Sequence, residues 1–147
     1  MSRQTVQRFM TVNPFVISSG ATLAQAHQVM RERNIRHLPV VDDERLVGLL
    51  SQRDIYLLET LRGVDPATET VAEAMSAEPF TVAPEAPLEQ VALAMARHKY
   101  GSAVVVDAGE VVGVFTTVDA LRALAALTQR RQRSEPVHER QPAAGQP

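Results

Sequence analysis

The sequence predicts an α+β fold in which two β-α-β-β-α repeats pack together with pseudo-twofold symmetry. A shift of 65 positions aligns the 147-residue chain with itself without a gap. Short β-branched runs alternate with segments of helical periodicity in both copies. A repeat of about 55 residues buries too little surface to be stable alone, so we expect both copies to fold as one body. Matching pairs include Met10 and Met75, Val47 and Val112, and Asp54 and Asp119.

The first copy begins with a short apolar run, Phe15–Ile17, which predicts a strand. Thr22 then opens a segment of helical periodicity, and Gln25 lies three residues later, as in a capping box. Two aliphatic runs around a charged turn predict a hairpin, and a second helix follows Ser51. The expected ranges are 38–41 and 46–50 for the hairpin strands and 51–61 for the helix.

The second copy repeats this order of elements. Its expected ranges are Phe80–Val82, 103–106 and 111–115 for strands, and 88–98 and 117–127 for helices. The domain organisation that follows is a first domain at 5–62, a linker at 63–70, a second domain at 71–128 and a tail at 129–147. The linker is too short for a free tether, so we expect it to carry the chain across one face to the next copy. The polar, arginine-rich tail predicts a frayed helix end followed by disorder.

Composition and charge exclude several functional classes. The net charge of −2 and the pI near 6.1 argue against nonspecific nucleic-acid binding. The absence of cysteine excludes thiolate nucleophiles and cysteine-ligated zinc, and the four histidines lack metal-site spacing. No apolar stretch approaches the roughly 20 residues of a membrane span, and the polar start is not a signal peptide. We therefore expect a cytoplasmic protein with no membrane, nucleic-acid, metal or cofactor partner.

The repeated motifs resemble a known family. The first copy contains Phe9–Thr11 followed by Pro14, then Arg36–Asp42, then Val47–Asp54. These motifs closely resemble the cystathionine-β-synthase (CBS) domain, and two in series resemble a CBS pair, or Bateman module. The resemblance covers residues 5–127. It implies a regulatory, non-catalytic module that binds adenine nucleotides or related adenosyl compounds in clefts between the copies, with AMP, ADP, ATP and S-adenosylmethionine as candidates.

A hydroxyl and a carboxylate recur at the start of the last helix of each copy. Ser51 precedes Asp54 by three residues, as Thr116 precedes Asp119. An ionised carboxylate accepts adjacent hydrogen bonds, which suits the two hydroxyls of a ribose, and free amides in a first helical turn attract phosphate. The same spacing is that of a capping box, which only stabilises the helix. We predict ribose binding by all four residues, with capping alone as the alternative.

Positive charge for a phosphate is supplied unevenly by the two copies. The first copy carries Arg36, His37 and Arg53 near the strand and helix starts. The matching places in the second copy are Gly101, Ser102 and Val118. The resemblance implies that basic residues before the Pro-Val strand contact phosphate, often from the copy opposite the ribose. We predict phosphate binding by the three basic residues; the alternative is two solvated arginines and a partly buried histidine.

Adenine requires a flat apolar slot, which the short first strands provide along their edges. The resemblance implies that this strand lines the base pocket. We therefore predict base contacts from Ile17 and Val82, with Pro39 and Val40 closing one side. The alternative is that all four residues are core, as apolar strand residues usually are.

The function predicted from these residues is a nucleotide sensor that acts on an unidentified regulated protein. The alternative is a dimerising protein-interaction module with empty or degenerate clefts, which the missing basic residues of the second copy favour. No nucleophile–base pair or paired carboxylates suggest an enzyme. Apolar helix positions favour a homodimer with isologous contacts. These positions are Leu57, Leu58, Leu61, Leu121, Leu124 and Leu127.

Overall fold

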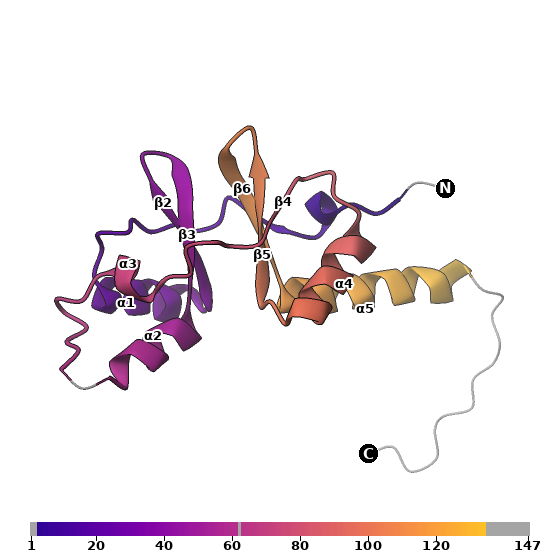
Figure 1. Ribbon diagram of the computed structural model, residues 1–147. Coiled ribbons are helices and arrows are strands. Elements are labelled where there is room, and N and C mark those ends of the chain that lie inside the picture. Colours follow the sequence, from indigo (N-terminus) through magenta and orange to yellow (C-terminus); the bar gives the residue numbers. More distant parts are fainter. Residues whose placement is uncertain (1–2, 62, 135–147) are drawn as a thin grey trace, which may run out of the picture.

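The structure, a computed structural model, describes residues 3–61 and 63–134, which form two units lying side by side (Figure 1). Each unit packs two helices against a β-hairpin, and the two hairpins point in the same direction. This arrangement confirms the predicted α+β class with two related repeats. The first unit contains α1 (Leu23–Arg33), β2 (His37–Asp42), β3 (Arg45–Ser51) and α2 (Gln52–Glu59). The second contains β4 (Thr81–Val82), α4 (Leu88–His98), β5 (Ser102–Asp107), β6 (Glu110–Thr116) and α5 (Thr117–Ser134).

Helix α1 begins as its sequence predicts. The Thr22 hydroxyl oxygen accepts a hydrogen bond from the Gln25 amide at 3.1 Å, and the Gln25 side-chain oxygen accepts one from the Thr22 amide at 2.9 Å. The capping box is therefore confirmed. In α4, Pro87 takes the place of Thr22 and its side chain makes no capping hydrogen bond.

Three short elements lie outside the prediction: η1 (Val6–Arg8), β1 (Thr11–Val12) and α3 (Val71–Ala74). Through them the two units exchange their leading segments. Val6, at the start of the first repeat, is fully buried in the core of the second unit, and Val71 is fully buried in the core of the first. Burying a valine side chain contributes about 1.5–3 kcal/mol. The predicted boundary at residue 71 thus marks the sequence repeat but not the packed unit.

The linker stays on the first unit. The amides of Leu23 and Ala24, at the start of α1, donate to the carbonyls of Glu69 and Pro66 at 2.9 Å each. These amides have no partner within their own helix, so the linker supplies one. The chain crosses to the second unit only after α3, on the way to β4 (Figure 1). Residues 63–70 therefore run along the first unit, and α3 lies between them and the crossing.

The strands at the seam pair more extensively in the second unit. There the order is β1-β6-β5-β4, with β1 antiparallel to β6 and β4 parallel to β5. In the first unit the counterparts are single bridges, between Leu49 and Ser76 and between Ile17 and Val40. The predicted strand Phe15–Ile17 is thus reduced to one bridging residue, because the chain leaves a left-handed turn at Asn13 (φ 47°).

Helix α5 continues to Ser134, beyond its predicted end near residue 127. Gln and Arg are strong helix formers, so residues 129–134 extend the helix at little cost. Residues 129–134, where the prediction places a frayed helix end, are thus helical, and residues 135–147 lie outside the described part of the chain. No helix among residues 3–61 and 63–134 is both long and apolar enough to span a membrane.

Close backbone packing at the seam requires glycine at position 48. A Cβ atom there would lie 2.5 Å from the Met75 sulfur and 2.8 Å from the Ser76 carbonyl oxygen. We expect Gly48→Ala to lower the free energy of unfolding by about 1–3 kcal/mol through overpacking, measured by urea unfolding. Gly20→Ala, where nothing lies within 4 Å, is the matched control and should change stability little. Equal stability of Gly48→Ala and the wild type would contradict the close packing of Met75 and Ser76 against the backbone at position 48.

Candidate functional site

A cleft of about 540 Å³ opens on the seam between the two units. Both units contribute to it, which is the arrangement that the repeat predicts. The first unit supplies Arg36, His37, Leu49, Ser51, Gln52, Arg53, Asp54 and Tyr56, and the second supplies Ser76, Glu78, Phe80, Lys99, Tyr100, Gly101 and Ser102. The structure therefore brings Ser51, Asp54 and all three predicted phosphate-binding residues together in one cleft.

Asp54 caps its helix and faces the cleft at the same time. Its Oδ2 atom accepts a hydrogen bond from the Ser51 amide at 2.9 Å, and the Ser51 hydroxyl accepts one from the Asp54 amide at 3.0 Å. Among the described residues nothing donates to Asp54 Oδ1, so this oxygen remains available to a ligand. The two interpretations of the Ser-x-x-Asp spacing are thus compatible in this half of the molecule.

The backbone amides at the start of α2 are largely occupied. The Gln52 amide donates to the Arg36 carbonyl at 2.8 Å, and the Asp54 amide is taken by Ser51. A phosphate here would therefore depend on side chains more than on the helix terminus, contrary to the sequence-based expectation. The side chains of Arg36, Arg53 and Lys99 provide three positive charges, against the two carboxylates of Asp54 and Glu78.

His37 lies deep in the cleft, against the backbone of the second unit. A Cβ atom at Gly101 would lie 2.8 Å from His37 Nε2, so only glycine leaves room for the imidazole ring. Burial lowers the pKa of His37, Asp54 opposes this shift, and the positive charge of Arg36 adds to it. The ring is therefore neutral at pH 7.

An aromatic stack borders the cleft on the side of the second unit. The rings of Phe80 and Tyr100 stack with centroids 5.1 Å apart, and Tyr100 stacks on His98 at the same distance. The sequence-based interpretation missed these residues. A signal was present, since the chain has only four Phe and two Tyr, and Tyr56, Phe80 and Tyr100 all line this cleft.

Ser102 also lines the cleft and was missed as a candidate. It is 2% exposed, and its hydroxyl oxygen has no hydrogen-bond partner within the part of the chain that the structure describes. A buried hydroxyl without a partner costs about 1–3 kcal/mol. A ligand in the cleft would relieve this cost.

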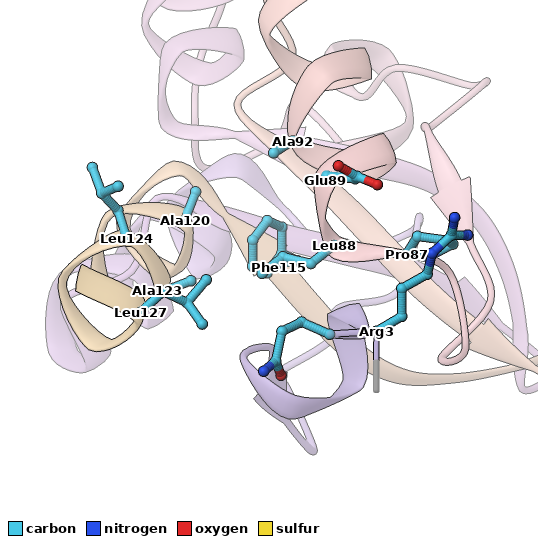
Figure 2. A pocket seen from close by; sticks show the side chains of 11 residues that line it. Arg3, Pro87, Leu88, Glu89, Ala92, Phe115, Ala120, Ala123, Leu124 and Leu127 are labelled. Carbon is cyan, nitrogen blue, oxygen red and sulfur yellow. The ribbon is translucent and has the colours of Figure 1, made fainter. Parts of the chain in front are cut away.

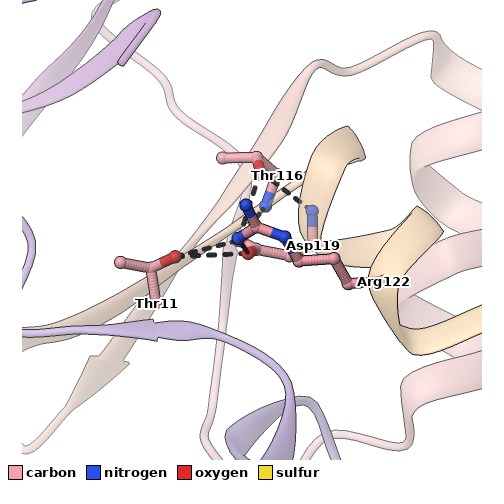
Figure 3. Close-up of polar contacts among 4 residues, drawn as sticks. All are labelled: Thr11, Thr116, Asp119 and Arg122. Carbon is pink, nitrogen blue, oxygen red and sulfur yellow. Dashed lines mark hydrogen bonds and ion pairs between the residues drawn. The ribbon is translucent and has the colours of Figure 1, made fainter. Parts of the chain in front are cut away.

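The second predicted ribose site is closed (Figure 3). Asp119 is 4% exposed, and its carboxylate accepts hydrogen bonds from the Thr116 amide at 3.0 Å and the Thr116 hydroxyl at 3.2 Å. The Thr11 hydroxyl donates to both carboxylate oxygens, at 3.2 and 3.3 Å, and an Arg122 nitrogen lies 3.8 Å from Oδ1. The Asp119 carboxylate is thus occupied by Thr11 and Thr116, and a ribose there would have to displace the Thr11 hydroxyl. Ribose binding by Thr116 and Asp119 stays a prediction.

The predicted base-binding residues lie outside the open cleft. Pro39 and Val40 are fully buried inside the first unit, and Ile17 bridges to Val40 beside the same core. Val82 pairs with Val105 and packs on the second core. Strand pairing turns these side chains inward, as the core alternative describes, and base contacts from these four residues stay a prediction.

An apolar groove of about 400 Å³ lies between α4, α5 and the N-terminal segment, away from the cleft (Figure 2). Its walls include Ala92, Ala120 and Ala123, with Phe115 at the base. The repeat places larger residues at the alanine positions in the first unit, namely His27, Ile55 and Leu58. The groove therefore results from small side chains in the second unit.

A sequence model of the CBS domain matches residues 6–58 and 71–126. The chain belongs to the CBS-domain family. It carries two CBS domains in tandem, which confirms the resemblance drawn from the repeated motifs. The matched ranges begin at Val6 and Val71, the two residues that the units exchange.

Similar proteins include a CBS-domain protein found by its sequence and two solved CBS pairs with bound adenosyl compounds. The CBS domain-containing protein YhcV of Bacillus subtilis strain 168 is 33% identical over 115 residues, which cover 78% of this chain and 81% of YhcV. The CBS domain pair of MJ0100, in complex with 5′-methylthioadenosine and S-adenosyl-L-methionine, matches with a TM-score of 0.78 and 26% identity over 86% of this chain and 99% of that one. Arabidopsis thaliana CBSX2 in complex with AMP matches with a TM-score of 0.72 and 26% identity, over 84% and 98%.

The lowered pKa of His37 predicts a pH dependence of stability. The unfolded chain binds this proton with the ordinary pKa of about 6.5, above that of the folded state. Stability is therefore fully present above pH 6.5 and falls as the pH drops below it, by at most about 1.4 kcal/mol per pH unit. We expect His37→Gln to reduce the loss of Tm between about pH 7 and pH 5.5, measured by thermal unfolding.

His98→Gln, which replaces an exposed histidine, is the matched control for the loss of one histidine in this measurement. Identical pH profiles for the wild type and His37→Gln would show that the imidazole is not buried in its neutral form.

Proposed function

We propose that this CBS protein is a non-catalytic regulatory module that binds one adenosyl compound in the open cleft on the seam. The observation that carries the proposal is the meeting of an available carboxylate oxygen on Asp54, three cationic side chains and an aromatic pair in that cleft. These are the groups that a ribose, a phosphate and a purine base require.

The roles of the cleft residues follow from their positions. Asp54 Oδ1 and the Ser51 hydroxyl hold the ribose, and Arg36, His37 and Arg53 face the phosphate. Phe80 and Tyr100 take the place of the strand residues first expected at the base, because an aromatic face stacks on a purine. The Ser102 hydroxyl gains a partner when the ligand is present.

The chemistry of the cleft favours binding over turnover. AMP, ADP, ATP and S-adenosylmethionine remain the candidates, and the known complexes of MJ0100 and CBSX2 with adenosyl compounds support this class. Among the described residues no group of three potential ligands is placed to hold a metal ion. The bound compound would act on an unidentified regulated protein only as far as its affinity differs between two arrangements of the units.

A thermal-shift panel of AMP, ADP, ATP and S-adenosylmethionine tests this function. A ligand at 100 times its Kd adds about 2.7 kcal/mol to stability, which raises Tm measurably. Asp54→Asn keeps an oxygen for helix capping but removes the charge that ribose hydroxyls bind. We expect it to weaken binding of the active compound by about 10- to 100-fold, measured by calorimetric titration.

Two arginines give the matched comparison for the phosphate. Arg53→Gln should weaken AMP binding more than adenosine binding, whereas Arg45→Gln, on the turn of the first hairpin, should change neither. If none of the four compounds raises Tm, the adenosyl-sensor proposal fails.

A second candidate function, a protein-interaction module, is favoured by the α4–α5 face. Leu121 and Leu124 are 65% and 60% exposed on α5. Leu124 borders the alanine-lined groove (Figure 2), and Leu121 borders a neighbouring hollow together with Ala92 and Ala120. Exposed leucines next to a groove of small residues are self-complementary when two copies meet about a twofold axis. We therefore propose a homodimer through this face, cytoplasmic like the sensor that it would form.

The oligomeric state tests this dimer. Leu121→Glu combined with Leu124→Glu places two charges on the face and should convert a dimer into a monomer, measured by light scattering after size-exclusion chromatography. Ala125→Glu, exposed on the same helix but outside the groove, should leave the mass unchanged. A monomeric wild type would exclude the homodimer.

A further inference from the structure

The two related carboxylates at the helix starts are in different states. Asp54 is half-buried and, among residues 3–61 and 63–134, is hydrogen-bonded only to its own capping residue, Ser51. Asp119 is 4% exposed and bonded to Thr116 and, across the seam, to Thr11. Thr11 is 108 positions away in sequence, so the contact joins the start of the first repeat to the end of the second.

The position of Thr11 is fixed by strand pairing. It lies in β1 and pairs with Val114 of β6, two residues before Thr116. The repeat gives Ser76 as its counterpart in the open cleft, where a single bridge to Leu49 holds the chain. Among the described residues Ser76 donates no hydrogen bond to Asp54. The two exchanged segments correspond in the repeat, but the one with Ser76 leaves Asp54 open and the one with Thr11 covers Asp119.

We propose that Thr11 holds the second cleft shut, so that the wild-type chain binds one ligand per pair of repeats. The inference rests on the proposed function of the open cleft, because both clefts would recognise a ribose by the same kind of carboxylate. A ligand at Asp119 must first displace the Thr11 hydroxyl, whose single proton is shared between the two carboxylate oxygens. This displacement weakens binding there by about 10- to 100-fold.

The chemistry around Asp119 also defines what the second cleft would take once Thr11 is removed. Arg53 and Lys99 of the open cleft correspond to Val118 and Asn34 in the repeat. Two positive charges of the open cleft are thus absent, and Arg122, whose nitrogen lies 3.8 Å from Asp119 Oδ1, is already paired with that carboxylate. A phosphate therefore gains less there than in the open cleft. The latent cleft therefore suits an uncharged nucleoside such as adenosine better than a nucleotide.

Calorimetric titration with adenosine tests the inference through stoichiometry. We expect one site in the wild type and two in Thr11→Ala, which removes the covering hydroxyl. Thr11→Ser keeps the hydroxyl and should retain one site. Thr11 is an exposed residue, so both variants should fold like the wild type, which thermal unfolding checks. The double variant Thr11→Ala with Asp54→Ala should bind one adenosine, at the second cleft alone.

The outcomes separate the two proposals. If adenosine or AMP binds the wild type once and Thr11→Ala gains no second site, Thr11 is not the closing residue and the inference fails alone. Two sites in the wild type would also overturn it. If no adenosyl compound binds the wild type, the proposed function fails. Even then, a site that appears in Thr11→Ala and disappears on Asp119→Asn would support the closure, and its absence would refute it.

Discussion

The reciprocal exchange of the leading segments is the constraint on which the rest of the structure depends. Val6 completes the core of the second unit and Val71 that of the first, so neither core is closed by its own continuous repeat. Each exchange is anchored by backbone hydrogen bonds, from Val6 to Ala86 at 2.9 Å and from Val71 to Ala21 at 2.8 Å. The two units are therefore tied to each other by both segments, and a cleft between them can have a defined shape.

The same exchange also delivers the residues that make the two halves of the seam unequal. After Val71 the chain places Ser76 and Phe80 at the open cleft, and after Val6 it places Thr11 against Asp119. A duplicated unit thus acquires one accessible carboxylate and one covered carboxylate through side chains that lie outside the helix-start motif. Whether a helix-start carboxylate is accessible is therefore decided by the side chain that the exchanged segment places beside it.

The elements were predictable where local sequence determines them. The α4 range, both hairpins and the Thr22 capping box follow from periodicity, turn residues and capping chemistry within a few positions. Ser51, Asp54 and the three basic residues were likewise correctly placed together, because all lie near strand and helix ends of one copy. The exchange of Val6 and Val71 was not predictable, since a short apolar segment carries no signal of which core it enters. The local pattern likewise did not point to Phe80 and Tyr100, because they reach the cleft from the opposite repeat.

A ligand in the proposed site on the seam would contact both units, so its binding energy would depend on how the units are arranged. Asp54 and Arg53 belong to the first unit, whereas Lys99, Tyr100 and the unpartnered hydroxyl of Ser102 belong to the second. Any movement of one unit against the other would separate these groups and lose part of the binding energy. A bound ligand must then favour the arrangement in which the groups of both units contact it. The shift in free energy equals the difference in the ligand's binding free energy between the two arrangements. A small molecule bound on the seam would therefore change the relative arrangement of the two units more than one bound to a single unit.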